Sequence, residues 1–548
     1  MIEEPLLRDN ILSNIYHNFA FYGDFLSKEE LLIPFTAAIA FLWLNWLITK
    51  FFFCGDYNSF ASKEHFVFLK KQKSHWLGLS LAVFSFLIYC GNALYQEVSI
   101  FNNFDMMSWY YTDSLSQGII PAVDRHLRFT PLHAVDFDVI FGISNNAYVI
   151  CFYVFMKQLL IMWLLYKFFD FITVPKRLIM IAVINFFPSV LWINTAIYPE
   201  QNVVIFVILS LIFLRRFQKN NRPRQLLYFM IFMNLALYSK ETAAIFYGGF
   251  GVYLLLSAVL SMKITLNSFF HPLKTIRMFP LEYLMFWSLL VFATGWMFYT
   301  DFGLRGNRYL VTHGVSITDA VMAYQTELFV NTVAIVIFFA TLLMKKNKVL
   351  YLISDGSLIG CTLISCLMVF FLKIVPITDA AVPYYLYLPA IFCTAYIFEN
   401  ITSKILLGVF LSVVIIISGY CNVNIAEAQQ GKERRDIAEY LASQARFVET
   451  VIYIDVNSPF VDHRWWKVMA WVNALLYSHP DIKIRYKLDA EVHRVWFLAH
   501  PLPVLVSKII PSRGDYILVN KAHNPDYEPA ANARLAYENR VYALYILE

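Results

Sequence analysis

Long apolar runs separated by short polar segments dominate this chain of 548 residues. A transmembrane helix needs about 20 mostly apolar residues. The runs that meet this requirement are 32–53, 77–96, 147–169, 178–197, 203–217, 225–239, 243–262, 281–300, 328–344, 349–372, 384–398 and 405–420. Charged residues make up only 15% of the chain, too few to cover the surface of a soluble protein of this length. The sequence therefore predicts an α-helical polytopic membrane protein with roughly twelve transmembrane helices.

Basic residues are distributed unevenly between the two alternating sets of loops. One set contains most of them, in residues 63–73, 176–177, 215–224, 263–277 and 345–348 and at Lys404. The other set contains only Arg125, Arg128, Lys240, Arg305 and Arg308. Because loops rich in Lys and Arg stay in the cytoplasm, the first set is predicted to be cytoplasmic. The second set and both termini are then predicted to lie on the opposite side, called the trans side below.

The composition changes to that of a soluble domain after Tyr420. Residues 425–447 have the pattern of an amphipathic helix. Short apolar runs at 450–455, 502–507, 515–519 and 541–547 alternate with helix-like stretches such as 465–478. The sequence thus predicts a transmembrane domain of residues 1–424, with a long trans loop at 98–146. A small soluble α/β domain of residues 425–548 follows it on the trans side.

Several classes of function find no support in the sequence. The seven Cys are scattered, without a CxxC pair or the spacing of metal ligands, so we expect neither a disulfide framework nor a zinc site. We expect no cofactor, and a divalent metal is compatible with the sequence without being indicated by it. The net charge of +5 follows from the cytoplasmic loops and gives no argument for nucleic acid. Residues 1–30 lack the basic region of a signal peptide, so we expect no removable signal peptide.

Five polar clusters lie next to the trans ends of the apolar runs. In residues 102–133, Asp105 opens a predicted interfacial helix that also contains Tyr110. The helix dipole favours a carboxylate at that position, so Asp105 is either a catalytic base or a simple N-cap. Glu200 lies in the short turn 198–202, which is either part of a site or a turn without function.

The other three clusters contain candidate cations and aromatic residues. Lys240 and Glu241 interrupt an apolar stretch, where an ionisable pair is costly unless it faces a cavity or is paired internally. Arg305 and Arg308 fit phosphate oxygens, although a solvated loop is the simpler explanation. Tyr384 lies where the chain re-enters the membrane, a common position for aromatic anchors. All five clusters lie on the same predicted side, as a site fed by a lipid-embedded substrate would require.

The order of these elements resembles the glycosyltransferase C superfamily, particularly the branch of bacterial aminoarabinose transferases and protein O-mannosyltransferases. The resemblance rests on Asp105…Tyr110…Gly118…Pro121…Arg128…Pro131, Tyr198-Pro199-Glu200, Tyr238-Ser239-Lys240-Glu241 and the stretch from Tyr384 to Pro389. The chain departs from the family pattern in two places. Met106 follows Asp105 where many members have a second acid, and Tyr384 stands where an Arg is common.

The resemblance implies an inverting membrane glycosyltransferase. Such an enzyme moves a sugar from a polyprenyl-phosphate donor to a lipid, glycan or protein acceptor. It implies catalytic roles for Asp105 and Glu200. It implies that the donor phosphate is bound by Arg128, Lys240, Arg305 and Arg308. It also implies that the substrate is contacted by Tyr110, Glu241 and Tyr384. The expected location is the bacterial inner membrane, with the site and both termini in the periplasm and membrane lipid as a partner.

Three other classes of protein remain open. An O-antigen ligase or polymerase also has about a dozen spans, but its large loop is usually late, whereas the long loop here is early. A multi-pass transporter tends to have repeated halves and charges at the bilayer midplane, and the sequence contains no visible repeat. A non-enzymatic scaffold is the third class.

Overall fold

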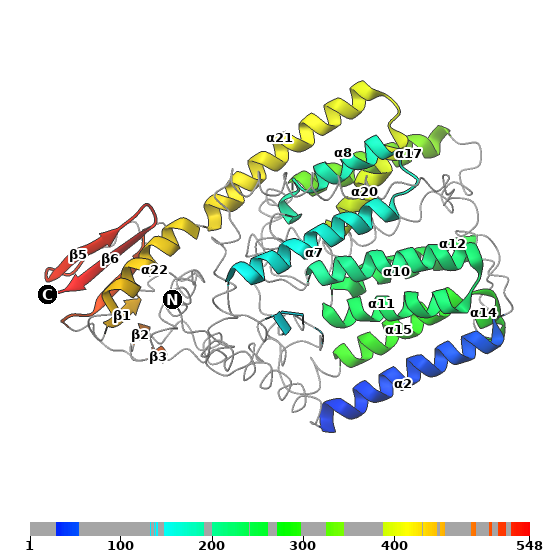
Figure 1. Cartoon of the computed structure of the whole chain (residues 1–548), viewed down its shortest axis with the longest axis horizontal. Coiled ribbons are helices and arrows are strands. Elements are labelled where there is room, and N and C mark those ends of the chain that lie inside the picture. The colour runs from blue at the N-terminus through cyan, green and yellow to red at the C-terminus, as the bar shows by residue number, and fades with distance from the viewer. Residues whose placement is uncertain are drawn as a thin grey trace.

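The computed structural model of the chain describes residues 29–53, 132, 136–137, 139–140, 147–190, 200–240, 242–260, 271–297, 325–344, 387–429, 431–445, 450–454, 484–488, 504–506, 513–521 and 528–548. It shows two regions: a bundle of helices that run side by side, and a small β-sheet accompanied by a helix (Figure 1). Helix α21 (Lys404–Gln429) extends from the bundle toward the sheet.

The bundle follows the apolar runs of the sequence. Besides α21, its helices are α2 (Glu29–Phe52), α7 (Ala147–Phe168), α8 (Val174–Ile184), α10 (Glu200–Asn220), α11 (Pro223–Ser239), α12 (Thr242–Leu260), α14 (Pro272–Met278), α15 (Pro280–Met297), α17 (Gln325–Met344) and α20 (Tyr387–Asn400). The predicted runs 77–96 and 349–372 lie outside the described residues, as does most of the loop 98–146. The number of spans therefore stays a prediction.

The outer surface of the bundle is apolar. Large hydrophobic side chains are exposed along several helices, among them Phe152, Val336, Leu343 and Ile416, each more than 60% exposed. By length and hydropathy alone, two of the described helices, Gln325–Met344 and Lys404–Cys421, could cross a membrane, and Thr36–Phe52 and Thr242–Val252 are shorter apolar helices. Exposed apolar surface on this scale suits lipid rather than water as the surrounding medium.

Helix α8 is shorter than the predicted run 178–197. It ends at Ile184, residues 185–187 form a turn, and a short helical segment follows at 188–190. Pro188 explains the break, because proline lacks a backbone N–H and disfavours the helical conformation in the residue before it. The Asn185 side chain donates to the Ile181 carbonyl at 3.1 Å, which satisfies one of the acceptors at the end of the helix.

Aromatic packing and a few polar contacts join the helices. Phe392 of α20 lies 6.1 Å from the ring of Phe168 and 5.7 Å from the ring of Phe246, in the main hydrophobic core. Ser210 and Tyr247 share a hydrogen bond of 2.6 Å between α10 and α12. Such buried polar contacts compensate side chains that would otherwise be unsatisfied in an apolar interior.

The C-terminal sheet has six strands in the order β3-β2-β1-β4-β6-β5. They are β1 (Thr450–Ile454), β2 (Ile484–Leu488), β3 (Val504–Val506), β4 (Tyr516–Asn520), β5 (Ala533–Glu538) and β6 (Tyr542–Leu547). Strands β3, β2, β1 and β4 run parallel to one another. Strand β6 is antiparallel to both β4 and β5. Helix α22 (Gly431–Ala445) packs on the sheet, where Tyr440 stacks on Tyr537 at 4.9 Å.

The sequence located four of the six strands, those at the apolar runs. It missed β2 and β5, whose sequences IRYKL and ARLAYE mix charged and apolar residues. It also placed the start of the amphipathic helix at residue 425, whereas residues 425–429 continue α21 and α22 begins at Gly431. The domain boundary at 424/425 thus falls inside one helix, and the division into two domains stays a prediction.

Candidate active site

A buried ion pair joins the start of α10 to the end of α11. Glu200 is the first residue of α10, and Lys240 follows the last residue of α11. The Lys240 Nζ lies 3.1 Å from Oε1 of Glu200, and both side chains are 5% exposed. Neither carboxylate oxygen of Glu200 accepts a hydrogen bond within the described part of the chain. Among the described residues, the Glu200 carboxylate is therefore held mainly by its ion pair with Lys240.

The backbone around Lys240 explains its position. Lys240 adopts an extended conformation, with φ −161° and ψ 136°, which ends α11. Its N–H donates to the Ala236 carbonyl at 3.2 Å, and its own carbonyl accepts from Ala243 at 3.1 Å. This single extended residue separates α11 from α12 over a break of two residues. The fixed backbone directs the side chain to the first turn of α10.

A second ion pair, with a buried lysine and a carboxylate that is 20% exposed, lies beside the first. Lys157, inside α7, donates to Oδ2 of Asp136 at 2.8 Å. Tyr153 donates to the same oxygen at 2.8 Å, and Asn202 donates to Oδ1 at 2.7 Å. Because Asn202 is two residues after Glu200, the first turn of α10 takes part in both pairs. The Asp136 carboxylate, unlike that of Glu200, is held by three donors.

The two pairs form one electrostatic unit of two acids and two bases. The carboxylate of Glu200 acts electrostatically on Lys157 as well as on Lys240. The ammonium of Lys157 also lies 4.0 Å from the ring centroid of Phe137. Charges so far from water are stable only when they are compensated locally. An arriving anion can therefore bind here if it replaces one of the carboxylates.

Leu132, in the second half of the predicted loop 98–146, contacts the end of α11 close to Lys240. The N–H of Leu132 donates to the Tyr238 carbonyl at 3.0 Å, two residues before Lys240. Leu132 is four residues after Arg128, one of the predicted phosphate ligands. Of the predicted site residues, the structure describes Glu200 and Lys240 and brings them together. Outside the described residues lie Asp105, Tyr110, Arg128, Glu241, Arg305, Arg308 and Tyr384.

Sequence reasoning missed Asp136, Tyr153, Lys157 and Asn202. The signal for Lys157 was available, since a lysine within an apolar run of about 20 residues needs a partner. Asp136 belonged to the acidic set of the trans loops but had no feature that distinguished it. The sequence also offered Glu241 as an internal partner of Lys240. Glu241 lies outside the described residues, and among the described residues Lys240 pairs with Glu200. No group of three or more His, Cys, Asp or Glu in the described ranges could hold a metal ion.

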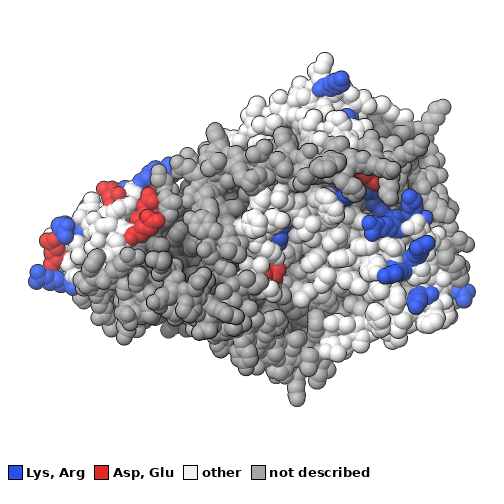
Figure 2. Space-filling model, viewed as in Figure 1, with Lys and Arg blue, Asp and Glu red and all other residues white. Residues whose placement is uncertain are grey.

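Cations at the other end of the bundle have different partners. Arg177 donates to the carbonyls of Tyr166, Asp170 and Ile172, and Lys176 donates to the carbonyls of Phe398 and Ile401. Figure 2 shows many Lys and Arg side chains gathered at this end, away from the sheet. Their placement agrees with the predicted cytoplasmic side, and their contacts cap the C-terminal ends of helices.

Three comparisons with known proteins bear on these observations. A search of curated proteins finds no match. Among solved structures, the chain is similar to the crystal structure of ArnT from Cupriavidus metallidurans bound to undecaprenyl phosphate, at 12% sequence identity. That likeness has a TM-score of 0.47 and covers 86% of this chain and 98% of the other.

The family comparison covers the segment that holds most of the two ion pairs. Residues 137–279 match the model of the family described as dolichyl-phosphate-mannose-protein mannosyltransferase. This segment contains Lys157, Glu200 and Lys240, and Asp136 precedes it by one residue. The resemblance predicted from the sequence is therefore confirmed over residues 137–279, which are similar to the dolichyl-phosphate-mannose-protein mannosyltransferase family.

Proposed function

We propose that this protein transfers one sugar, with inversion, from a polyprenyl-phosphate donor to a lipid, glycan or protein acceptor. The reaction takes place at the end of the bundle where Glu200 and Lys240 meet. In the proposed orientation this end faces the periplasm of a bacterial cell, and the donor enters from the surrounding lipid. The C-terminal sheet lies beyond the same end of the bundle (Figure 1).

The observation that carries the proposal is the 3.1 Å contact between Lys240 and Glu200. A buried ammonium whose only charged partner in the described residues is one weakly held carboxylate can exchange that partner for a phosphate. Exchange keeps the ammonium neutralised, and the Glu200 carboxylate that it releases keeps its electrostatic interaction with Lys157. The Asp136–Lys157 pair, with its three donors on one carboxylate, is better suited to hold α7 and α10 in place.

The chemistry follows from charge development in the transition state. The acceptor oxygen or nitrogen attacks the anomeric carbon while the bond between that carbon and the phosphate oxygen breaks. Negative charge grows on the leaving polyprenyl phosphate, and Lys240 stabilises it. Arg128, Arg305 and Arg308 are proposed to add further cations, because one ammonium leaves a phosphate dianion incompletely neutralised.

The acceptor must lose a proton during the attack. Asp105 is the proposed general base, and Glu200, once Lys240 has turned to the phosphate, orients the acceptor or takes the proton instead. Tyr110, Glu241 and Tyr384 are proposed to contact the sugar or the acceptor. No metal is assigned a role in these steps.

A panel of donors tests the proposal. Purified protein in lipid nanodiscs is incubated with polyprenyl-phosphate sugars that differ in the sugar, and release of free polyprenyl phosphate is measured. We expect release with at least one donor, and a fall of about 100-fold or more in Lys240→Gln. The matched control is Lys404→Gln, an exposed lysine at the far end of the bundle, which should leave the rate unchanged. Equal rates in the two variants would refute the assigned role of Lys240.

A further inference from the structure

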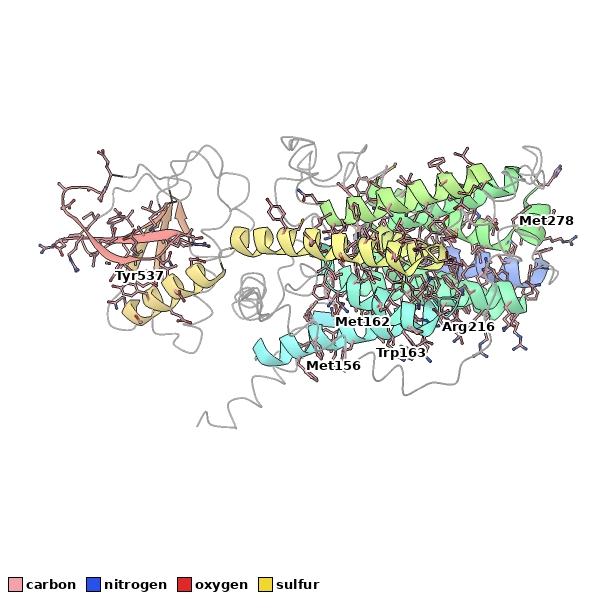
Figure 3. The ribbon with its side chains drawn as sticks, turned by 90° about the horizontal axis from the view of Figure 1, so that it is seen from above. Met156, Met162, Trp163, Arg216, Met278 and Tyr537 are labelled. Carbon is pink, nitrogen blue, oxygen red and sulfur yellow. The ribbon has the colours of Figure 1, made fainter. Side chains whose placement is uncertain are left out.

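Cations and aromatic rings cover the ends of three neighbouring helices, far from the proposed active site. We call the set Trp163, Lys167, Phe213, Arg216, Arg222, Arg224 and Tyr228 the basic–aromatic surface. It spans the ends of α7, α10 and α11 that lie away from the sheet. Figure 3 places Trp163 and Arg216 on the same side of the bundle, and Figure 2 shows the gathered cations from the other direction.

Each of the three helices pairs a cation with a ring. Arg216 lies 5.2 Å from the ring of Phe213 on α10, and Lys167 lies 5.9 Å from the ring of Trp163 on α7. On α11, Arg224 lies 5.6 Å from the ring of Tyr228 and donates to its hydroxyl at 3.0 Å. A ring beneath a cation restricts the side chain and leaves the other donors of the cation available.

Two consecutive arginines on α10 differ in their exposure to solvent. Arg215 is buried, donates to the Phe168 carbonyl and pairs with Asp170 at 3.2 Å. Arg216, the next residue, is exposed. Within the described part of the chain, none of Lys167, Arg216, Arg222 and Arg224 forms an ion pair. The positive charge of this surface is therefore uncompensated by acidic side chains among the residues that the structure describes.

The hairpin between α10 and α11 brings its cations close together. Asn221 adopts a positive φ of 50°, and its N–H donates to the Phe217 carbonyl at 2.7 Å. This conformation, which Asn tolerates better than most residues, reverses the chain within two residues. The last turn of α10 and the first turn of α11 consequently lie side by side and present their cations together.

An aromatic stripe continues from the cations along the same two helices. Phe213 stacks on Phe232 at 5.5 Å with an interplanar angle of 4°, and it lies 4.9 Å from Tyr228. Phe206 is 6.3 Å from Phe232. All four rings are half-buried. A ligand that fits this surface therefore has an anionic group at one end and an apolar part that extends along the bundle.

We propose that the basic–aromatic surface binds an anionic phospholipid, with the headgroup phosphate on Arg216, Arg222 and Arg224 and an acyl chain along the aromatic stripe. A small soluble anion would use the cations but would leave the aromatic stripe uncovered. Cations next to a membrane attract the anionic headgroups of lipids. The inference does not depend on the proposed transfer reaction, because the surface lies at the opposite end of the bundle.

Native mass spectrometry of the full chain tests this site. The protein is released from nanodiscs that contain phosphatidylcholine with phosphatidylglycerol, and the retained lipids are identified. We expect the wild type to retain phosphatidylglycerol selectively. The variant Lys167→Gln/Arg216→Gln/Arg222→Gln/Arg224→Gln should retain at least about tenfold less. The matched control Arg513→Gln/Lys521→Gln/Arg534→Gln/Arg540→Gln removes the same charge from the sheet domain and should retain phosphatidylglycerol as the wild type does.

Two further measurements keep the test decisive. If the fourfold variant does not fold, Arg216→Gln alone should weaken retention by several-fold, and added salt should weaken retention by the wild type. Equal retention of the two lipids by the wild type would overturn the proposal, and so would equal loss in the variant and its control. Either result would favour a protein partner over lipid as the ligand of this surface.

Discussion

The two ends of the helix bundle bury cations in different ways. At the end that faces the sheet, Lys240 and Lys157 are compensated by the carboxylates of Glu200 and Asp136. At the opposite end, Lys176 and Arg177 are compensated by backbone carbonyls at the ends of helices. Carbonyls belong to the backbone and cannot leave without unwinding a helix. A carboxylate side chain can turn away from its partner. The Asp170 carboxylate pairs with Arg215 at the opposite end, but Arg215 keeps the Phe168 carbonyl as a second acceptor, so we expect exchange for an external anion at the first end.

This difference between the two ends predicts that one end mainly determines stability and the other mainly determines sugar transfer. Changes at the carbonyl-capped end should weaken packing and leave the reaction of the folded protein intact. Changes at the carboxylate-paired end should affect transfer of the sugar more than they affect folding, provided that no charge is left alone. The variants below test this separation, beginning with the largest expected effect.

The largest effect is expected for Asp105→Asn. Loss of a general base removes a factor of about 10² to 10⁴ from the rate. We expect transfer to fall by about 1,000-fold, because the amide has no site for the proton of the acceptor. The rate of polyprenyl phosphate release checks this, and unchanged thermal unfolding serves as the control. Near-normal release would remove Asp105 from the role and leave Glu200 as the base.

Next in size is Lys240→Gln, which leaves Glu200 buried without its partner. Breaking a buried pair in this way costs about 3–5 kcal/mol of stability, and transfer should fall about 100-fold. The double variant Lys240→Gln/Glu200→Gln removes both charges, so we expect stability to recover while transfer stays low. Calorimetry and a transfer assay on the same samples separate the two effects. Recovery of transfer in the double variant would show that the pair is only structural.

A smaller effect is expected for Arg215→Gln at the opposite end. It removes the contacts of a buried guanidinium with the Phe168 carbonyl and with Asp170, which should lower the unfolding free energy by about 2–3 kcal/mol. The specific activity of the folded fraction should be unchanged. The exposed neighbour provides a control, since Arg216→Gln should change stability in detergent by less than about 0.5 kcal/mol. A specific loss of transfer in Arg215→Gln would erase the distinction between the ends.

The smallest effect is expected at the surface of the sheet domain. Lys521 and Glu538 pair at 2.7 Å, with side chains 34% and 48% exposed. Lys521→Gln should lower stability by less than about 1 kcal/mol, because water screens an exposed pair. Chemical denaturation of the full chain measures this change. A loss of several kcal/mol would mean that the surface of the sheet is less solvated than its exposure indicates.

The helical bundle was predictable because a membrane imposes a single requirement on every span. Runs of apolar residues predicted α10, α11 and α12 to within a few residues, and the break at Lys240 was visible as charge within an apolar stretch. The same rule failed at α8, because hydropathy does not register the missing N–H of Pro188. In the sheet, β2 and β5 were not predicted because their sequences mix charged and apolar residues.

The pairing at the site could not be predicted in the same way. The sequence located Glu200 and Lys240 separately, but their contact depends on how α10 and α11 pack. The sequence left open whether Lys240 pairs with the adjacent Glu241 or faces a cavity. Asp136 and Lys157 are 21 residues apart, and nothing in either segment specifies the other. Such contacts arise from the packing of the helices and cannot be predicted from hydrophobic periodicity or composition.

A charge swap tests the central claim most directly. Glu200→Lys/Lys240→Glu keeps a buried, neutral pair but moves the cation from α11 to α10. We predict that this variant unfolds within a few degrees of the wild type and releases no polyprenyl phosphate from a donor that the wild type uses, because the phosphate now meets a carboxylate at residue 240. Release at a rate close to that of the wild type would contradict the account, since it would mean that the pair needs only to be neutral.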